Sequence, residues 1–473
     1  MDVKREIEYL KSEATRISWS PHELPDINLQ IPPTVYPPRE DTSLLDQVVA
    51  EIPFKPGQKV LEIGCGSGAI SISSRLRGWE VFCCDTNPYA VSATLGNASL
   101  NGIKWSGENV IEGGPGDDYF AQISEDNFDL IIWNLPYLDT PPEKSPRLGP
   151  LEESGLIENN QCQELISLLE QRPGLLNKKG VVLLLHSSNQ LGHLIPKLWR
   201  SGGWATRPVA WTNIGDEKLT VIACWRPFEE AIKIHLEKCE STNSVAMELE
   251  NVPTGSLVTT SHQTKGRGFS GNNWDNPKEG FMGSWVFGRK SIEKGAEWLQ
   301  IASSVAVIDS ISTALMEGLP SHCWTNSSIL EDMGVRIKWP NDIWYIGRAG
   351  LGKMAGTLVE GKTQGEDVRV VIGIGFNKIP PNGKCFEGWN SITDIHSDLM
   401  AIILNASIAS IIEEQPKLPP IEIERIYSVA YSAMRCSLCE TRSLFYGLSS
   451  KGNIISDTGI IDTTTGGRRW EWV

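Results

Sequence analysis

Residues 58–71, which read QKVLEIGCGSGAIS, decide the fold of the first half of the chain. A short apolar strand runs into three glycines at alternate positions, Gly64, Gly66 and Gly68, and a helix is expected to start near Ala69. Glycine lets the backbone turn tightly and come close to a nucleotide-like ligand. The stretch therefore predicts the first strand–turn–helix unit of a doubly wound α/β sheet.

The strand that follows supports a ligand of this kind. Residues 80–84 are mainly apolar and lead into Asp85, whose carboxylate can accept hydrogen bonds from both hydroxyls of a ribose. An NAD-binding fingerprint reads GxGxxG, whereas the glycines here read GxGxG and follow Glu62. The pattern therefore favours S-adenosylmethionine (SAM) over a nicotinamide dinucleotide. The predicted SAM-binding residues are Glu62, Gly64, Cys65, Gly66, Gly68, Asp85 and Asn134.

A third signal predicts the transfer chemistry. Residues 128–133 form an apolar strand that delivers NLPY at its carboxyl end, where ligands of open α/β sheets bind. An amide nitrogen has its lone pair tied up in resonance, so it attacks a methyl sulfonium only when its protons are drawn away. The side-chain carbonyl of Asn134 and the backbone carbonyl of Leu135 can each accept one proton. Pro136 stiffens the loop and Tyr137 can lie flat on the planar group, so Asn134, Pro136 and Tyr137 are the predicted catalytic residues.

With these motifs in place, residues 1–228 resemble the glutamine-directed methyltransferases that modify peptide-chain release factors, in the short form without a helical N-terminal domain. Residues 36–45 match that family's Y-x-P-x-E-D-T-x-L-L motif, whose threonine, here Thr42, contributes to the SAM pocket. Residues 85–90 match its D-x-N-P-x-A segment. The resemblance implies a release factor with a Gly-Gly-Gln motif as substrate and a small zinc-containing activator subunit as partner.

One position leaves the methyl acceptor open. The family reads NPPY where this chain reads NLPY, which is also the form found in adenine dimethylases of ribosomal RNA. Leu135 keeps the backbone carbonyl but lacks the stiffness of proline. Methylation of adenine in RNA or DNA is therefore the alternative to methylation of glutamine.

Composition and charge narrow the classes of partner. The chain has 473 residues and a formal net charge of −15, with 20 basic and 29 acidic residues up to residue 228 and 23 and 29 after it. Neither half is basic, which disfavours nucleic acid as a partner. No apolar run approaches the ~18 residues of a membrane-spanning helix. Several cysteines lie in strand-like runs (Cys83, Cys84, Cys224), so we expect a cytoplasmic protein with reduced thiols and no membrane segment.

The second half is organised around residues 338–342, KWPND, and residues 353–356, KMAG. They place two lysines, an amide and a carboxylate around a proline-stiffened turn. A carboxylate that approaches a nucleotide phosphate is repelled by it, and lysines can hold the two anions together and spread the charge that develops on the α-phosphate. The stretch therefore predicts activation of a carboxylic acid by a nucleotide, with Lys338 and Lys353 as catalytic residues.

Three flanking motifs extend this site: residues 241–243 (STN), which favour a helix N-cap, the glycine-rich basic loop 259–268, and the strand 370–377 with two glycines on one face. With them, residues 233–400 resemble the catalytic domain of biotin–protein ligases, which form biotinyl-adenylate from biotin and ATP and pass biotin to a carrier-protein lysine. The resemblance implies ATP, biotin and Mg²⁺, with no assigned metal ligands, and the biotin carrier domain of a carboxylase as partner. By position it implies a biotin and ATP site of Ser241, Thr242, Asn243, Gln263, Gly266, Arg267, Trp274, Lys338, Asn341, Lys353, Gly373, Gly375 and Asn377.

The loop that follows the second glycine departs from that family. Basic residues are usual there, whereas this chain has Phe269, Asn272 and Asn273. A charge-assisted hydrogen bond contributes ~1.5–3 kcal/mol, so the loss of two loosens the adenylate by roughly two to four orders of magnitude. Two alternatives stay open: a lipoate-type ligase, although the RRxxGGG motif of lipoate ligases is absent, and a non-catalytic module that binds biotin or a carrier.

The sequence thus predicts two enzymes in one chain. Residues 1–228 are expected to form an α/β doubly wound, Rossmann-like SAM-dependent methyltransferase domain. Residues 229–412 are expected to form an α+β biotin-ligase catalytic domain, and residues 413–473 its small C-terminal β-domain. The expected functions are N-methylation of a glutamine side chain and ATP-dependent biotinylation of a carrier lysine through biotinyl-AMP.

Overall fold

The computed structural model describes twelve segments of the chain: residues 11–117, 127–136, 161–188, 192–268, 271–292, 294–315, 322, 334–347, 350–364, 367–382, 385–435 and 445–461. Contacts divide the chain into two compact units. The first unit comprises Met1–Trp199, Thr206–Trp225 and Gln415–Pro419. The second comprises Arg200–Ala205, Arg226–Glu414 and Pro420–Val473. The three domain ranges expected from the sequence stay predictions.

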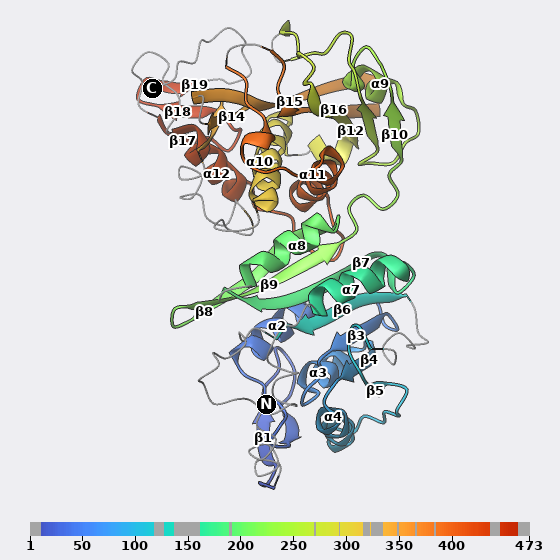
Figure 1. Cartoon of the computed structure of the whole chain (residues 1–473). Helices are drawn as coiled ribbons and strands as arrows, with labels where there is room; N and C mark the ends of the chain where they lie inside the picture. The colour runs from blue at the N-terminus through green and yellow to red at the C-terminus, as the bar shows by residue number, and fades with distance from the viewer. Residues whose placement is uncertain are drawn as a thin grey trace. The chain divides into compact units, whose positions relative to one another are not determined.

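The first unit is built on a seven-stranded sheet in the order β5-β4-β3-β6-β7-β9-β8, whose strands are labelled in Figure 1. Each adjacent pair from β5 to β7 is parallel, and β9 runs antiparallel to β7. The chain order reverses at β3, so the carboxyl ends of β3 and β6 lie where ligands of doubly wound sheets bind. The bounds are β3 Lys59–Ile63, β4 Glu80–Asp85, β5 Val110–Glu112, β6 Phe128–Asn134, β7 Leu176–Ser187, β8 Ala205–Ile214 and β9 Glu217–Trp225.

Local sequence explains the helices beside this sheet. Helix α3 starts after Gly68, at φ +79°, and ends at Gly78, whose φ of +110° suits a left-handed C-cap. Helix α4 begins with Pro88, and the side chain of Asn87 caps it by accepting from the backbone N–H of Tyr89 at 3.0 Å. The elements are the hairpin β1 Thr15–Trp19 and β2 Ile27–Ile31, and the helices α2 Glu40–Glu51, α3 Ala69–Arg77, α4 Pro88–Leu100, α7 Gln161–Gln171, η1 Gly192–Leu194 and α8 Ile195–Ser201.

The core of the first unit follows the apolar runs. Residues 181–185 on β7 are all fully buried, as are Leu130, Ile131 and Ile132 on β6. Central parallel strands are covered on both faces, which is why these stretches are continuously apolar rather than alternating. The doubly wound fold expected from the sequence is confirmed.

The second unit holds another seven-stranded sheet, in the order β10-β11-β12-β16-β15-β14-β13. Its first pair is parallel and the remaining pairs are antiparallel. The KWPND motif lies at the turn between β13 and β14, with a cis peptide bond between Trp339 and Pro340. The bounds are β10 Lys233–Leu236, β11 Leu257–Thr260, β12 Glu279–Gly288, β13 Val335–Lys338, β14 Asp342–Gly347, β15 Gly350–Gln364 and β16 Asp367–Ile379.

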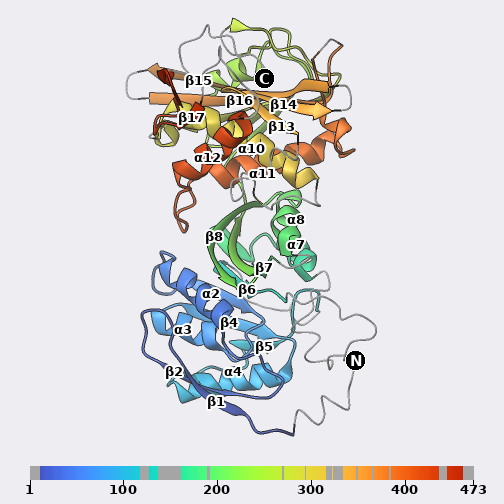
Figure 2. The same ribbon diagram turned by 90° about the vertical axis from the view of Figure 1, so that its left-hand side faces the viewer.

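Helices α10 and α11 lie against one face of this sheet, as both views show (Figures 1 and 2). Residues 298–314 of α10 are all buried, as expected for a helix enclosed on every side. The C-terminal stretch is not purely β, because α12 packs on α10 and β13 before a three-stranded sheet. The bounds are α9 Thr242–Glu248, η3 Arg289–Ile292, α10 Ala296–Ala314, η6 Trp389–Ser391, α11 Ser397–Ile412, α12 Ile423–Arg435, β17 Phe445–Leu448, β18 Ile454–Ser456 and β19 Gly459–Ile461.

Within the segments that the structure describes, no helix is long and apolar enough to cross a membrane.

Candidate active sites

The glycine turn after β3 closes on Asp85. Gly64, Gly66 and Gly68 have φ values of +70°, +53° and +79°, a region that favours glycine. The backbone N–H of Gly66 donates to Oδ2 of Asp85 at 2.8 Å, and that of Asn87 donates to Oδ1 at 2.8 Å. A carboxylate has about four lone-pair sites, so both oxygens can still accept from ribose hydroxyls. The turn and its carboxylate therefore fit the nucleoside end of SAM.

Two other predicted SAM-binding residues flank the turn inside the protein. Glu62 ends up buried on β3, and burial raises its pKa to about 8, although the hydroxyl of Ser71 donates to its carboxylate and lowers it in part. Cys65 is buried too, and its hydrogen bond with Cys83, followed by burial, raises the pKa of its thiol. A neutral Cys65 thiol packs against the turn, and Glu62 offers a carboxylate to a cationic group only after it has lost the proton that burial stabilises.

The carboxyl end of β6 meets the first turn of α2. The Nδ2 of Asn134 donates to Oδ2 of Asp41 at 2.9 Å. The other carboxylate oxygen of Asp41, Oδ1, accepts from the backbone N–H of Thr42 at 2.7 Å. The Oδ1 of Asn134 is left buried and without a hydrogen-bond partner. Thr42 and Asn134 thus both contact the carboxylate of Asp41. Pro136, two residues after Asn134, is half-buried. The predicted catalytic Tyr137 lies outside the described residues.

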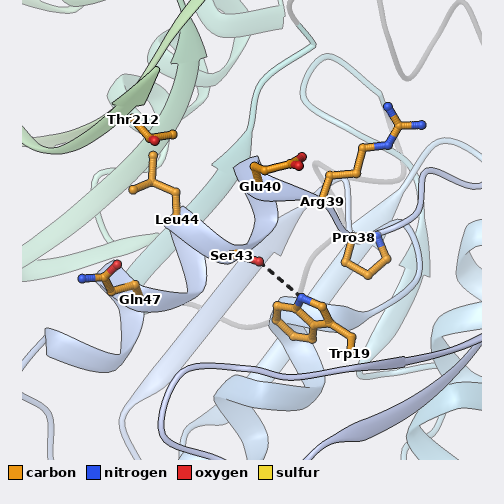
Figure 3. A pocket seen from close by; sticks show the side chains of 8 residues that line it. All are labelled: Trp19, Pro38, Arg39, Glu40, Ser43, Leu44, Gln47 and Thr212. Carbon is orange, nitrogen blue, oxygen red and sulfur yellow. Dashed lines mark hydrogen bonds between the residues drawn. The ribbon is translucent and has the colours of Figure 1, made fainter. Parts of the chain in front are cut away.

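An open hollow of about 760 Å³ lies on the outer face of α2. Figure 3 shows the indole of Trp19 directed toward Ser43, and its Nε1 lies 3.4 Å from the hydroxyl oxygen. Two oppositely charged side chains at the start of α2, Arg39 and Glu40, stand at its edge (Figure 3). The hollow contains none of the predicted SAM-binding residues. Its lining is Trp19, Pro38, Arg39, Glu40, Ser43, Leu44, Gln47 and Thr212.

The second unit has a small cavity, of about 40 Å³, between α9, the loop 263–276 and the strands β14 to β16. Ten of the predicted biotin and ATP residues line it, whereas Gly266, Lys338 and Asn377 do not. The lining is Ser241, Thr242, Asn243, Gln263, Arg267, Gly268, Trp274, Asn341, Asp342, Lys353, Gly356, Thr357, Leu358, Gly373, Ile374 and Gly375. The motifs quoted from five parts of the sequence therefore meet at one place.

The two predicted catalytic lysines have different surroundings. The Nζ of Lys353 lies 2.7 Å from Oδ1 of Asp342 and 5.3 Å from the ring centroid of Trp274, inside the cavity. The Nζ of Lys338 lies 5.6 Å from the ring centroid of Trp344. Asn377 supports the first lysine, since its Nδ2 donates to the backbone carbonyl of Lys353 at 3.3 Å. The structure therefore puts Lys353, and not Lys338, at the cavity.

The indole of Trp274 occupies much of the space that a ligand needs. A Cβ added at Gly375 would lie 2.3 Å from this ring, and one at Gly356 would lie 3.1 Å from it. The backbone N–H of Trp274 donates to the carbonyl of Gly266 at 3.0 Å, which joins two parts of this loop. Small-molecule sites usually have volumes of ~300–1,000 Å³, so this cavity of about 40 Å³ is smaller than a ligand of biotin's size needs.

A polar network fixes the opposite wall of the cavity. Glu360 accepts from Nδ2 of Asn243 at 2.7 Å and from Nη2 of Arg267 at 2.9 Å. The hydroxyl of Ser284 donates to Oδ1 of Asn243 at 2.6 Å. Ser241 stands at the N-cap of α9, as expected, but its side chain makes no capping hydrogen bond. Gln263 is tied in through its Oε1, which accepts from the backbone N–H of Thr242 at 2.8 Å.

Three carboxylates that lie at these sites, Asp41, Asp342 and Glu360, are not among the predicted site residues. Asp41 and Asp342 stand inside motifs that were recognised for other residues, so their positions carried a signal. Glu360 follows no motif, and it meets Asn243 because α9 packs on β16, the strand that pairs with β15. In the part of the chain that the structure describes, no group of three His, Cys, Asp or Glu side chains could hold a metal. A role for Mg²⁺ therefore stays a prediction.

Comparison with known proteins finds a different family in each half of the chain. A family model described as biotin/lipoate A/B protein ligase matches residues 236–377, and one described as ribosomal protein L11 methyltransferase matches residues 42–136. The chain is 32% identical over 207 residues to a putative protein N5-glutamine methyltransferase of Methanocaldococcus jannaschii, an alignment that covers 43% of this chain and 98% of that protein.

The alignments with two other relatives cover a smaller share of each relative's length. A release factor glutamine methyltransferase of Shewanella oneidensis is 28% identical over 172 residues, and the alignment covers 35% of this chain and 57% of that protein. Human biotin–protein ligase is 30% identical over 126 residues, which cover 26% of this chain but only 15% of that protein. Among solved structures, a biotin protein ligase from Aquifex aeolicus in complex with biotin and ATP aligns with a TM-score of 0.36 at 21% identity, over 51% of this chain and 99% of that one.

Proposed function

This chain belongs, through its first half, to the protein N5-glutamine methyltransferase family, and we propose that it methylates the side-chain amide nitrogen of a glutamine in a release factor. The second half carries a biotin/lipoate ligase domain. We propose that this domain attaches biotin to a lysine of a carrier protein through biotinyl-AMP. Each proposal is supported by one feature of its site.

The unpaired oxygen of Asn134 supports methylation of an amide. SAM supplies an electrophilic methyl group. The Oδ1 of Asn134 accepts one N–H of the substrate amide and the backbone carbonyl of Leu135 accepts the other, which raises the electron density on the nitrogen. The nitrogen then forms a bond to the methyl carbon, the carbon–sulfur bond breaks, and one amide proton leaves to water. Pro136 keeps both acceptors in place before the substrate arrives.

A protein fits the surface beside this site better than RNA does. Arg39 and Glu40 offset each other at the hollow outside α2, and Trp19 and Leu44 offer apolar surface there. A polyanion needs clustered basic side chains, whereas a polypeptide can use mixed charges and apolar contacts. The names of the relatives of this half also specify protein acceptors. We therefore place protein ahead of adenine as the methyl acceptor.

Methyl transfer from labelled SAM tests this proposal. The full chain is incubated with a release factor that contains Gly-Gly-Gln, with the same factor carrying Gly-Gly-Ala, and with ribosomal RNA. We expect label in the first alone. Label that appears in RNA and in neither protein would refute glutamine as the acceptor.

Lys353 supports the ligase proposal, because its ammonium lies in a cavity that the biotin-ligase motifs build together. We propose that this ammonium holds the carboxylate of biotin near the α-phosphate of ATP and stabilises the charge that develops there. A carboxylate oxygen then bonds to phosphorus and pyrophosphate leaves. The family model covers lipoate ligases as well, so lipoate is the second candidate acid.

Pyrophosphate release from ATP separates the two acids and a pure binding module. Release is measured with biotin, with lipoate and with neither, for the wild type and for Lys353→Ala. Because a charge-assisted hydrogen bond contributes ~1.5–3 kcal/mol, the variant should slow biotin-dependent release by roughly 10- to 100-fold or more.

The matched control is Lys362→Ala. This lysine lies on the same strand, β15, with about half of its side chain exposed (53%), and pairs loosely with Glu248 at 3.8 Å. It should release pyrophosphate at the wild-type rate. If neither acid causes pyrophosphate release, the domain is a binding module and not a ligase. If lipoate causes faster release than biotin, lipoate is the substrate.

Further partners follow from the same proposals. A small zinc-containing activator is proposed for the methyltransferase half, and a carboxylase carrier domain for the ligase half. A cytoplasmic location is proposed as well, and it is supported by cysteines such as Cys83 and Cys84, which are buried on the strands of the first sheet and form no disulfide.

A further inference from the structure

We propose that Asp41 is a positioning residue for methyl transfer: its carboxylate holds the amide of Asn134 so that the amide oxygen, and not the amide nitrogen, faces the substrate. This inference rests on the proposed glutamine methylation and deepens it. Within the EDT motif, residues 40–42, only Thr42 is a predicted site residue.

The two carboxylate oxygens of Asp41 bind different parts of the protein. Its side chain is buried, at 2% exposure, in the first turn of α2. Oδ1 accepts from the backbone N–H of Thr42 at 2.7 Å and lies 3.2 Å from the hydroxyl of Thr42, so the carboxylate is fixed to its own helix. Oδ2 accepts from Nδ2 of Asn134 at 2.9 Å. One oxygen thus anchors the carboxylate, and the other reaches β6, 93 residues along the chain.

This arrangement matters because an amide has nearly the same shape in both orientations. Its oxygen only accepts and its nitrogen only donates, so the neighbours decide which way the group points. A carboxylate accepts only, and it therefore selects the orientation in which Nδ2 of Asn134 faces Asp41. The opposite atom, Oδ1, is then turned away, and it is the buried acceptor without a partner. A substrate N–H meets an acceptor there without any reorganisation.

The substitution Asp41→Asn reverses this selection with almost no change in volume. Its oxygen stays with the N–H of Thr42, and its new NH₂ group then points at Asn134. Asn134 must turn its oxygen toward that NH₂, which presents Nδ2 to the substrate. A donor would then face the substrate N–H groups, and methyl transfer should fail even though the helix and the glycine turn are kept.

Steady-state methylation of a Gly-Gly-Gln release factor by the full chain tests the proposal. For Asp41→Asn we expect kcat to fall roughly 10- to 100-fold, because a misplaced group at a reaction site lowers the reaction rate by a factor of this order. The Kd for SAM, measured by titration, should stay within about twofold, because the carboxylate acts on the acceptor side. A fall in SAM affinity with unchanged kcat would overturn the positioning role.

The matched control is Asp46→Asn on the same helix. Asp46 is fully buried and pairs with Arg77 at 2.7 Å, and within the described residues no hydrogen bond joins it to Asn134. It should lower thermal stability and leave kcat unchanged, which separates loss of a buried charge from loss of orientation.

A double-mutant cycle gives the second readout. In the Asn134→Ala background, Asp41→Asn should change kcat by less than about twofold, because Asp41 acts through Asn134 alone. Full additivity would overturn the proposal. A wild-type chain that methylates no Gly-Gly-Gln protein would instead refute the proposed function and the inference with it, whereas an active wild type with an equally active Asp41→Asn refutes the inference only.

Discussion

Some side chains at the two sites can be assigned from their position in the sequence, whereas others are recognised only from the residues that pack against them. Asp85 could be assigned from its place after a strand, because the turn geometry requires glycines and leaves a carboxylate beside them. The pairing of Asp41 with Asn134 could not be predicted, because it depends on how the start of α2 packs against the end of β6. Lys338 is a different case: the motif predicts a catalytic lysine there, and its ammonium lies 5.6 Å from the ring centroid of Trp344 and is not part of the cavity lining, so its role stays a prediction.

Glu62 leads to a prediction about pH. Its pKa is raised by burial from 4.5 to about 8, so the folded protein keeps a proton that the unfolded chain has lost. The contribution of Glu62 to stability is fully present below about pH 4.5 and is lost as the pH rises toward 8. Wild-type stability should therefore fall relative to Glu62→Gln across this range, by at most ~1.4 kcal/mol per pH unit.

Urea unfolding at pH 5, 6.5 and 8, followed by hydrogen exchange on β3, checks this prediction. Glutamine can still accept from the hydroxyl of Ser71, so the variant keeps that contact while it removes the titration. Parallel stability curves for the two proteins would show that Glu62 titrates at its ordinary pKa.

At the scale of elements, the strand β16 is the floor of the ligase cavity. Sequence alone predicted a strand with two glycines on one face, and Gly373 and Gly375 do lie side by side beneath Asn243 and Trp274. The pairing of β16 with β12 and β15 was not predictable from a local pattern, since these strands lie far apart in the chain. The helix α12 is not among the predicted elements, because the strand-like pattern that predicts a β-domain lies only at the end of the C-terminal segment.

Gly373→Ala tests the role of this floor. A Cβ at Gly373 would lie 2.0 Å from Oδ1 of Asn243, which is held by Ser284 and by Glu360 on the other side of its amide. The network must shift, so biotin affinity should fall at least about tenfold and the free energy of unfolding by ~1–3 kcal/mol.

Calorimetric titration with biotin measures the affinity, and Gly361→Ala is the control. Gly361 lies on the neighbouring strand β15, where the nearest heavy atom to an added Cβ would be 3.7 Å away. This variant should bind biotin like the wild type. Normal biotin binding by Gly373→Ala would show that the cavity is not the biotin site.

At the scale of the whole molecule, each half is organised around motifs that the sequence already displays. The glycine turn, Asp85 and Asn134 come together in the first unit because the strands that carry them are adjacent and parallel. Ten of the predicted ligase residues line one cavity of the second unit. The composition, with both halves acidic, agrees with protein substrates for both sites. The chain is therefore interpreted as two protein-modifying enzymes in one polypeptide.

One crossed experiment tests this claim most directly. The full chain, Asn134→Ala and Lys353→Ala are each incubated with labelled SAM, a Gly-Gly-Gln release factor, ATP, labelled biotin and a carboxylase carrier domain. The account predicts both labelled proteins with the wild type, only the biotinylated carrier with Asn134→Ala, and only the methylated release factor with Lys353→Ala. A wild type that labels one protein or neither, or a single variant that loses both labels while it remains folded, would contradict it.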